Sequence, residues 1–169
     1  ELDNCIYSGG GCTGTGFVTV SGYGEFRQNG HAGADLSWDG NGSGLVVFSK
    51  GAVTLANINA NNNGYYDFPT DAYFGHGVYV ENNGGVGNVS ITGNNNFQNN
   101  YRSGLEVYSK GSISLSNVYA DGNGRYDDPF YGGADVTLDT VYGYGVVLDN
   151  SGGTLKSVTL TGDNSFYNN

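Results

Sequence analysis

Short runs of alternating hydrophobic and polar residues recur along this chain, and each run ends at glycine or asparagine. In the run at Val53, Thr54 and Leu55, two apolar side chains flank a polar one, and the run at Val89, Ser90 and Ile91 does the same. A period of two is the pattern of a β-strand with one buried face. Runs this short predict brief strands joined by tight turns.

The runs belong to an internal repeat. Residues 44–51 (GLVVFSKG) return as residues 104–111 (GLEVYSKG), and residues 89–100 return as residues 158–169. Such a repeat indicates one supersecondary unit stacked on copies of itself. Two kinds of rung alternate, so the full period covers two rungs, and residues 18–29 are a partial copy of the second kind. The pattern predicts a coil of about five rungs whose strands stack in parallel, ~4.8 Å apart.

Alignment of the copies predicts columns of inward side chains. These columns are Val18/Val89/Val158, Val20/Ile91/Leu160, Phe26/Phe97/Phe166, Leu45/Leu105, Val53/Ile113 and Leu55/Leu115. Asparagines fall at equivalent turn positions as well, at Asn57/Asn117, Asn82/Asn150 and Asn100/Asn169. Stacked amides can hydrogen-bond along a coil, whereas a left-handed turn is the alternative role for such asparagines. The amide ladder is favoured at Asn100 and Asn169.

The repeat boundaries predict a single domain. Its parts are an N-terminal cap (1–17), a partial repeat (18–43), a first repeat (44–100) and a second repeat (101–169), which together span 1–169. Within the cap, Cys5 and Cys12 close a short glycine-rich loop, and this spacing favours a disulfide between them. A disulfide in turn favours an extracellular or cell-surface location.

Four segments carry a family resemblance. They are similar to the right-handed parallel β-helix repeat proteins, particularly the glycine- and asparagine-rich arrays of large bacterial surface proteins, and comprise residues 44–64, 77–100, 104–124 and 145–169. The resemblance implies an all-β, right-handed parallel β-helix with inserted aromatic loops. It specifies architecture and not activity, because this fold carries enzymes, adhesins and scaffolds alike.

Composition narrows the classes of partner. The formal net charge is −10, and the six lysines and arginines are scattered singly. Nucleic acid is not expected as a partner, because binding to its phosphates needs a clustered basic surface. Membrane insertion is not expected either, because no run of about twenty apolar residues is present.

The second insert between rungs contains candidate metal ligands. Asp121, Asn123, Asp127 and Asp128 place four oxygen donors within eight residues, a spacing that could hold calcium. The alternative is a polar turn built from Asx and glycine residues. Calcium is therefore a candidate ligand, and no other cofactor is expected.

Both inserts are rich in aromatic residues. They are Tyr65, Tyr66, Phe68, Tyr73 and Phe74 in the first insert, and Tyr126, Phe130, Tyr131, Tyr142 and Tyr144 in the second. Three roles compete for these side chains: packing within the loop, contact with another protein, and stacking on glycans.

The inventory of reactive residues disfavours an enzyme. The sequence has no nucleophile elbow, no Ser/His/Asp set and no phosphate-cradling loop. His76 lies between two glycines where the second repeat has Tyr144, which favours an aromatic packing role for the histidine. A polysaccharide lyase or glycoside hydrolase of the parallel β-helix type is the alternative that the family resemblance leaves open.

The last repeat predicts how the chain functions. Phe166, Asn168 and Asn169 stand where the first repeat continues into another rung, so this end is expected to be open for stacking. Head-to-tail contacts that do not close generate a filament. The chain is therefore expected to be an extracellular structural subunit of a surface fibre, with copies of itself as partners. A surface adhesin or glycan-binding module, with cell-surface glycans as partners, is the alternative.

Overall fold

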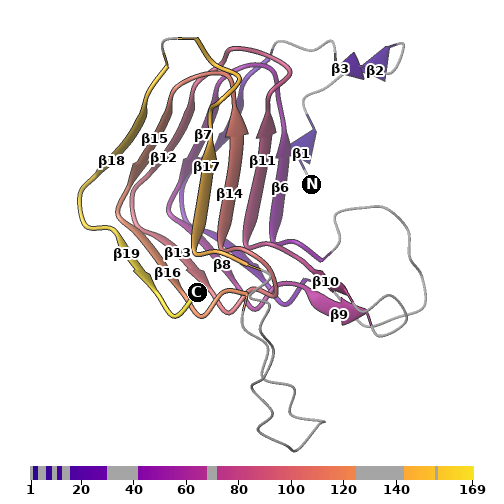
Figure 1. The fold of residues 1–169 in the computed structure, drawn as a ribbon, viewed down its shortest axis with the longest axis vertical. Helices are drawn as coiled ribbons and strands as arrows, with labels where there is room; N and C mark the ends of the chain where they lie inside the picture. The colour runs from indigo at the N-terminus through magenta and orange to yellow at the C-terminus, as the bar shows by residue number, and fades with distance from the viewer. Residues whose placement is uncertain are drawn as a thin grey trace, which may run out of the picture.

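The computed structural model describes residues 2–3, 7–8, 11–12, 16–29, 42–67, 72–124, 143–154 and 156–169. All regular elements in these ranges are β-strands (Figure 1). Most of them build three parallel sheets with five strands each. We call these the first, second and third sheets, in the order in which the chain passes through them.

The strands of each sheet follow one another along the stack. The first sheet contains β1 (Leu2–Asp3), β6 (Leu45–Phe48), β11 (Val78–Asn82), β14 (Leu105–Ser109) and β17 (Val146–Asp149). The second contains β4 (Val18–Val20), β7 (Val53–Ala56), β12 (Val89–Thr92), β15 (Ile113–Ser116) and β18 (Val158–Thr161). The third contains β5 (Gly24–Arg27), β8 (Ile58–Asn61), β13 (Asn95–Gln98), β16 (Val118–Asp121) and β19 (Ser165–Tyr167).

Each rung takes one strand from each sheet. The chain runs through β6, β7 and β8 and then begins the next rung with β11, so that consecutive turns of the coil lie side by side (Figure 1). The first rung is β1, β4 and β5, and the fifth is β17, β18 and β19. This arrangement confirms the predicted all-β parallel β-helix and its number of rungs.

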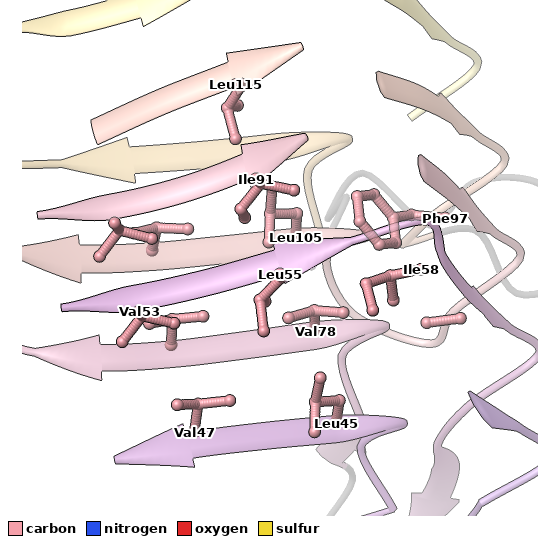
Figure 2. Close-up of a cluster of buried hydrophobic side chains, with 14 of the residues drawn as sticks. Leu45, Val47, Val53, Leu55, Ile58, Val78, Ile91, Phe97, Leu105 and Leu115 are labelled. Carbon is pink, nitrogen blue, oxygen red and sulfur yellow. The ribbon is translucent and has the colours of Figure 1, made fainter. Parts of the chain in front are cut away.

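The strand register confirms the inward columns and joins those predicted for the two kinds of rung. Val18 pairs with Val53, Val53 with Val89, and the column continues through Ile113 and Val158. Figure 2 shows Val53, Leu55 and Ile91 of the second sheet together with Leu45, Val78 and Leu105 of the first sheet in one continuous core. The alternation of apolar and polar residues therefore places one side chain per rung in each column, because successive strand residues point to opposite faces.

One column explains why the period covers two rungs. The third sheet stacks Phe26, Ala60, Phe97, Ala120 and Phe166, so that a large and a small side chain alternate. The position two residues earlier compensates for the size of the side chain in this column. Ile58 and Val118 stand there in the alanine-containing strands, whereas Asn95 stands there in the strand of Phe97. Interior packing is dense, so a large residue in one rung requires a small one above and below it.

Two further strand pairs lie outside the three sheets. The antiparallel pair β2 (Tyr7–Ser8) and β3 (Gly11–Cys12) belongs to the segment predicted as a cap, and β9 (Tyr65–Asp67) pairs with β10 (Ala72–Phe74) in the first insert. β1, from the same predicted cap, adds a parallel strand to β6. Cys5 lies outside the described residues, so its disulfide with Cys12 stays a prediction.

The corners between the second and third sheets alternate asparagine and glycine. Asn57 and Asn117 have φ values of 56° and 51°, and Gly93 has a φ of 75°. The side chain of Asn57 also accepts a hydrogen bond from the backbone N–H of Asn94 in the rung above, at 3.1 Å. Glycine is needed in that rung, because a Cβ on Gly93 would lie 2.3 Å from the Asn57 Oδ1 atom. These two asparagines therefore combine the left-handed turn with a bond between rungs.

Candidate functional site at the end of the β-helix

A ladder of five asparagine side chains runs along the inside of one corner of the coil. Its members, one from each rung, are Asn29, Asn63, Asn100, Asn123 and Asn169. Asn63 Nδ2 donates to Asn100 Oδ1 at 2.9 Å, and Asn100 Nδ2 donates to Asn123 Oδ1 at 2.8 Å. The ladder predicted at Asn100 and Asn169 is therefore present, and it includes three more asparagines. Two of these, Asn63 and Asn123, precede a glycine in the inserts, a signal that the alignment of the repeats missed.

Every interior rung of the ladder repeats the same four bonds. The Oδ1 atom of Asn100 accepts from both the side chain and the backbone N–H of Asn63, the latter at 3.1 Å. The second Nδ2 hydrogen of Asn100 bonds the carbonyl oxygen of Ala60 at 3.0 Å. Asn63, Asn100 and Asn123 are fully buried. The ladder thus satisfies buried backbone groups at a corner where the sheets cannot pair.

The fifth rung leaves its inward side chains uncovered. Val158, Leu160 and Phe166 are 41, 46 and 43% exposed. In the rung below, Ile113, Leu115 and Ala120, their partners in the same columns, are 0–1% exposed. The end face also carries the free strand edges of β17, β18 and β19, which lie at one end of the stack in Figure 1. Free edges and exposed apolar side chains together form a surface that can pair with another strand.

The end face is hollowed. An open concavity of about 610 Å³ is lined by residues of the last rung, among them the apolar Val146, Leu148, Leu160 and Phe166 and the polar Tyr144 and Asn169. Its lining is the set of positions that a sixth rung would cover. The C-terminal residues predicted as a stacking end therefore lie together: Phe166 and Asn169 line the concavity, and Asn168 donates to Asp121 at 3.0 Å.

A second polar cluster lies on the outer side of the first sheet. The Glu106 carboxylate accepts hydrogen bonds from the hydroxyls of Ser103, at 2.7 Å, and Tyr108, at 3.0 Å. His76 Nδ1 lies 3.3 Å from Glu106 Oε1 without the geometry of a hydrogen bond. His76 and Glu106 are each only 7% exposed. The ring of His76 also contacts Tyr79, with centroids 5.6 Å apart, as expected for its predicted aromatic packing.

Tyrosine and glutamate alternate on this part of the first sheet. Tyr79 bonds Glu81 at 3.0 Å in one rung, as Tyr108 bonds Glu106 in the next, and the two tyrosine rings lie 5.7 Å apart. Burial, and then the neighbouring carboxylates, raise the pKa of both tyrosines, so the phenols stay protonated donors. Sequence reasoning missed the cluster, because its members come from two rungs and their shared face appears only when the strands are in register.

Burial sets the charge of His76. It lowers the pKa of the imidazole to about 4; Glu106 acts in the opposite direction, and Arg102 adds a smaller lowering. The folded protein therefore holds a neutral histidine at neutral pH. A neutral imidazole can accept a proton, although a substrate would have to reach a nearly buried ring.

Acidification is expected to destabilise the protein through His76. Between pH 6.5, the ordinary pKa, and pH 4, the unfolded chain binds a proton that the folded chain does not, so the penalty grows as the pH falls. It reaches about 3 kcal/mol at low pH. Urea unfolding at pH 7 and pH 4 should show this loss, and His76→Tyr, which introduces the residue found at Tyr144 in the second repeat, should lack it. An equal pH dependence of the two proteins would contradict the assignment.

The predicted calcium ligands have different surroundings. Asp121 accepts hydrogen bonds from Tyr119 at 3.2 Å and from Asn168, and the side-chain oxygen of Asn123 is occupied in the ladder. Asp127 and Asp128 lie outside the described residues. Among the residues that the structure does describe, no group of three or more His, Cys, Asp or Glu could hold a metal ion. The calcium site stays a prediction.

The aromatic residues of the inserts are described in part. Tyr65 and Phe74 stack on each other with centroids 5.4 Å apart, which is packing within the loop, whereas Tyr144 is 63% exposed. Tyr66, Phe68, Tyr73, Tyr126, Phe130, Tyr131 and Tyr142 have side chains outside the described part of the chain. An exposed pair that the sequence did not single out, Tyr119 and Tyr167, lies on the third sheet with centroids 6.1 Å apart.

Comparisons with known proteins complete the description. Within the described ranges, no helix has the length and apolar character needed to span a bilayer. No family model, curated protein or solved structure matches the chain.

Proposed function

We propose that this chain is an architectural module of an extracellular fibre of the glycine- and asparagine-rich bacterial surface type, and that its fifth rung binds a further β-helix rung from a second copy. The observation that carries the proposal is the uncovered end face. Three side chains there are more than 40% exposed, although their column partners in the second, third and fourth rungs are fully buried. The role proposed is structural, not catalytic.

Energetic considerations support the same role. Apolar area contributes about 25 cal/mol for each Å² removed from water, so covering Val158, Leu160 and Phe166 favours association. The free edges of three strands carry unpaired backbone N–H and C=O groups, which soluble β-helices otherwise shield with a cap. Pairing these groups with a further rung adds hydrogen bonds. Contacts between the two different ends of a molecule do not close on themselves, so they extend into a rod.

Charge placed on the end face is expected to weaken assembly. In Leu160→Asp the carboxylate would be buried at the joint between copies, so association should weaken at least tenfold, a loss of about 1.4 kcal/mol. The monomer should still fold, because Leu160 is 46% exposed. Sedimentation velocity across a concentration series measures the association, and negative-stain electron microscopy shows whether rods form.

Ser114→Asp is the matched control. Ser114 is exposed on the outer side of β15, in the fourth rung. An aspartate at this position therefore adds the same charge without facing the end of the stack. Its association should equal that of the unmodified chain. Unmodified protein that stays monomeric at every concentration would refute the proposed function, as would equal association of the two variants.

A further inference from the structure

The hydrogen bonds between the side chains of the asparagine ladder all run in one direction along the stack. Each side chain donates toward the C-terminal rung and accepts from the N-terminal side. Within the described residues, Asn29 Oδ1 therefore accepts no hydrogen bond, although the oxygens of the four later members each accept two. At the other end, the backbone N–H and one Nδ2 hydrogen of Asn169 have no acceptor among these residues. One end of the ladder offers donors and the other offers an acceptor.

We propose that this polarity determines the joint: the N-terminal rung of a second copy stacks on the fifth rung, with its Asn29 accepting from Asn169. The inference rests on the proposed function and adds direction and register to it. The joint would reproduce the bonds inside each copy, where a backbone N–H and an Nδ2 group donate to one Oδ1 atom, as Asn123 does to Asn169 at 3.1 and 2.9 Å. A tail-to-tail contact would set donor against donor.

The register of the strands extends this pairing across the second and third sheets. Continuing the columns by one rung places Val158 on Val18, Thr159 on Thr19 and Leu160 on Val20. It also places Phe166 on Phe26 and Tyr167 on Arg27. Inward positions thus meet apolar positions in every case. Phe166 on Phe26 is the one contact that departs from the alternation of large and small side chains inside each copy.

Cysteine cross-linking tests the direction and the register. Thr19 and Thr159 are exposed, and facing residues of adjacent strands lie ~4.8 Å apart, within reach of a disulfide. A mixture of Thr19→Cys and Thr159→Cys chains should form a mixed disulfide under mild oxidation, identified by mass spectrometry of the linked peptides. Thr161→Cys, two residues out of register, should link to Thr19→Cys at least tenfold less.

The ladder itself is tested by Asn169→Asp. This substitution replaces the free donor by an acceptor that faces the Asn29 oxygen, so association should weaken at least tenfold. Asn94→Asp, the same change at an exposed side chain with no hydrogen bond among the described residues, should leave association unchanged. Thermal unfolding of each variant at a concentration that favours monomers reports separately on the folded chain.

The outcomes separate the two proposals. A stronger mixed disulfide with Thr161→Cys than with Thr159→Cys would overturn the register while the proposed fibre subunit stood. Disulfides between two Thr159→Cys chains, with no mixed product, would show a tail-to-tail contact, which closes on itself, and would overturn both proposals. Equal association of Asn169→Asp and Asn94→Asp would overturn the role of the ladder. Absence of any association in the unmodified chain would refute both proposals.

Discussion

Replacing Asn100 by leucine is expected to lower the free energy of unfolding by about 4 kcal/mol, a loss outside the usual range of single substitutions. Leucine is similar in size but cannot hydrogen-bond. The Ala60 carbonyl oxygen and the backbone N–H of Asn63 would lose their partners inside a fully buried corner. Each unsatisfied buried group costs about 1–3 kcal/mol, and the side chains of Asn63 and Asn123 each lose a bond as well.

Urea unfolding followed by circular dichroism measures this loss. Asn94→Leu is the control, because Asn94 is exposed and its side chain makes no hydrogen bond among the described residues. It should change stability by no more than about 0.5 kcal/mol. If Asn100→Leu cost less than about 1 kcal/mol, the ladder would be a consequence of the fold and not one of its stabilising elements.

Phe97→Ala is expected to cost about 4 kcal/mol, because it removes a fully buried ring and leaves a cavity between Ala60 and Ala120. The alternating column makes a sharper prediction possible. Ala120→Phe alone should also destabilise the protein, by about 1–3 kcal/mol, because its ring would meet that of Phe97.

The double variant should be more stable than the sum of the two single effects. In Phe97→Ala with Ala120→Phe, the new ring can enter the space that the old one left, which predicts a coupling of about 1 kcal/mol or more. A double-mutant cycle measured by urea unfolding provides the coupling. Simple additivity would show that the alternation of large and small side chains does not decide how neighbouring rungs pack.

The local pattern was a good guide to the strands and columns. Val53, Leu55 and Ile91 could be assigned to the core because a strand turns every second side chain to the same face. The pattern could not show that the columns of the two rung kinds are the same columns. That depends on pairing between residues such as Val53 and Val89, which are separated by a turn and an insert, and the insert does not alter the register of the strands.

The candidate site divides in the same way. Phe166 and Asn169 could be recognised from the repeat, because their counterparts in the first repeat lead into another rung. The sequence predicts Asn123 as a calcium ligand, since a polar insert offers the same oxygen atoms to a metal as to a neighbouring amide. Its burial and its contact with Asn100 identify it as part of the ladder. Neither property can be recognised in an asparagine-rich sequence.

The sequence by itself therefore determined the architecture: alternating short strands, repeated in pairs, stack as a parallel β-helix because stacking equivalent residues in register buries the inward columns. Tertiary structure alone decided three features: the merging of the columns, the meeting of His76 with Glu106, and the direction of the asparagine ladder. The physical reason is that hydrogen bonds between rungs join residues more than twenty positions apart. Which asparagine donates and which accepts in such a bond depends on the stacking of the rungs, and the order of residues in the sequence does not show it.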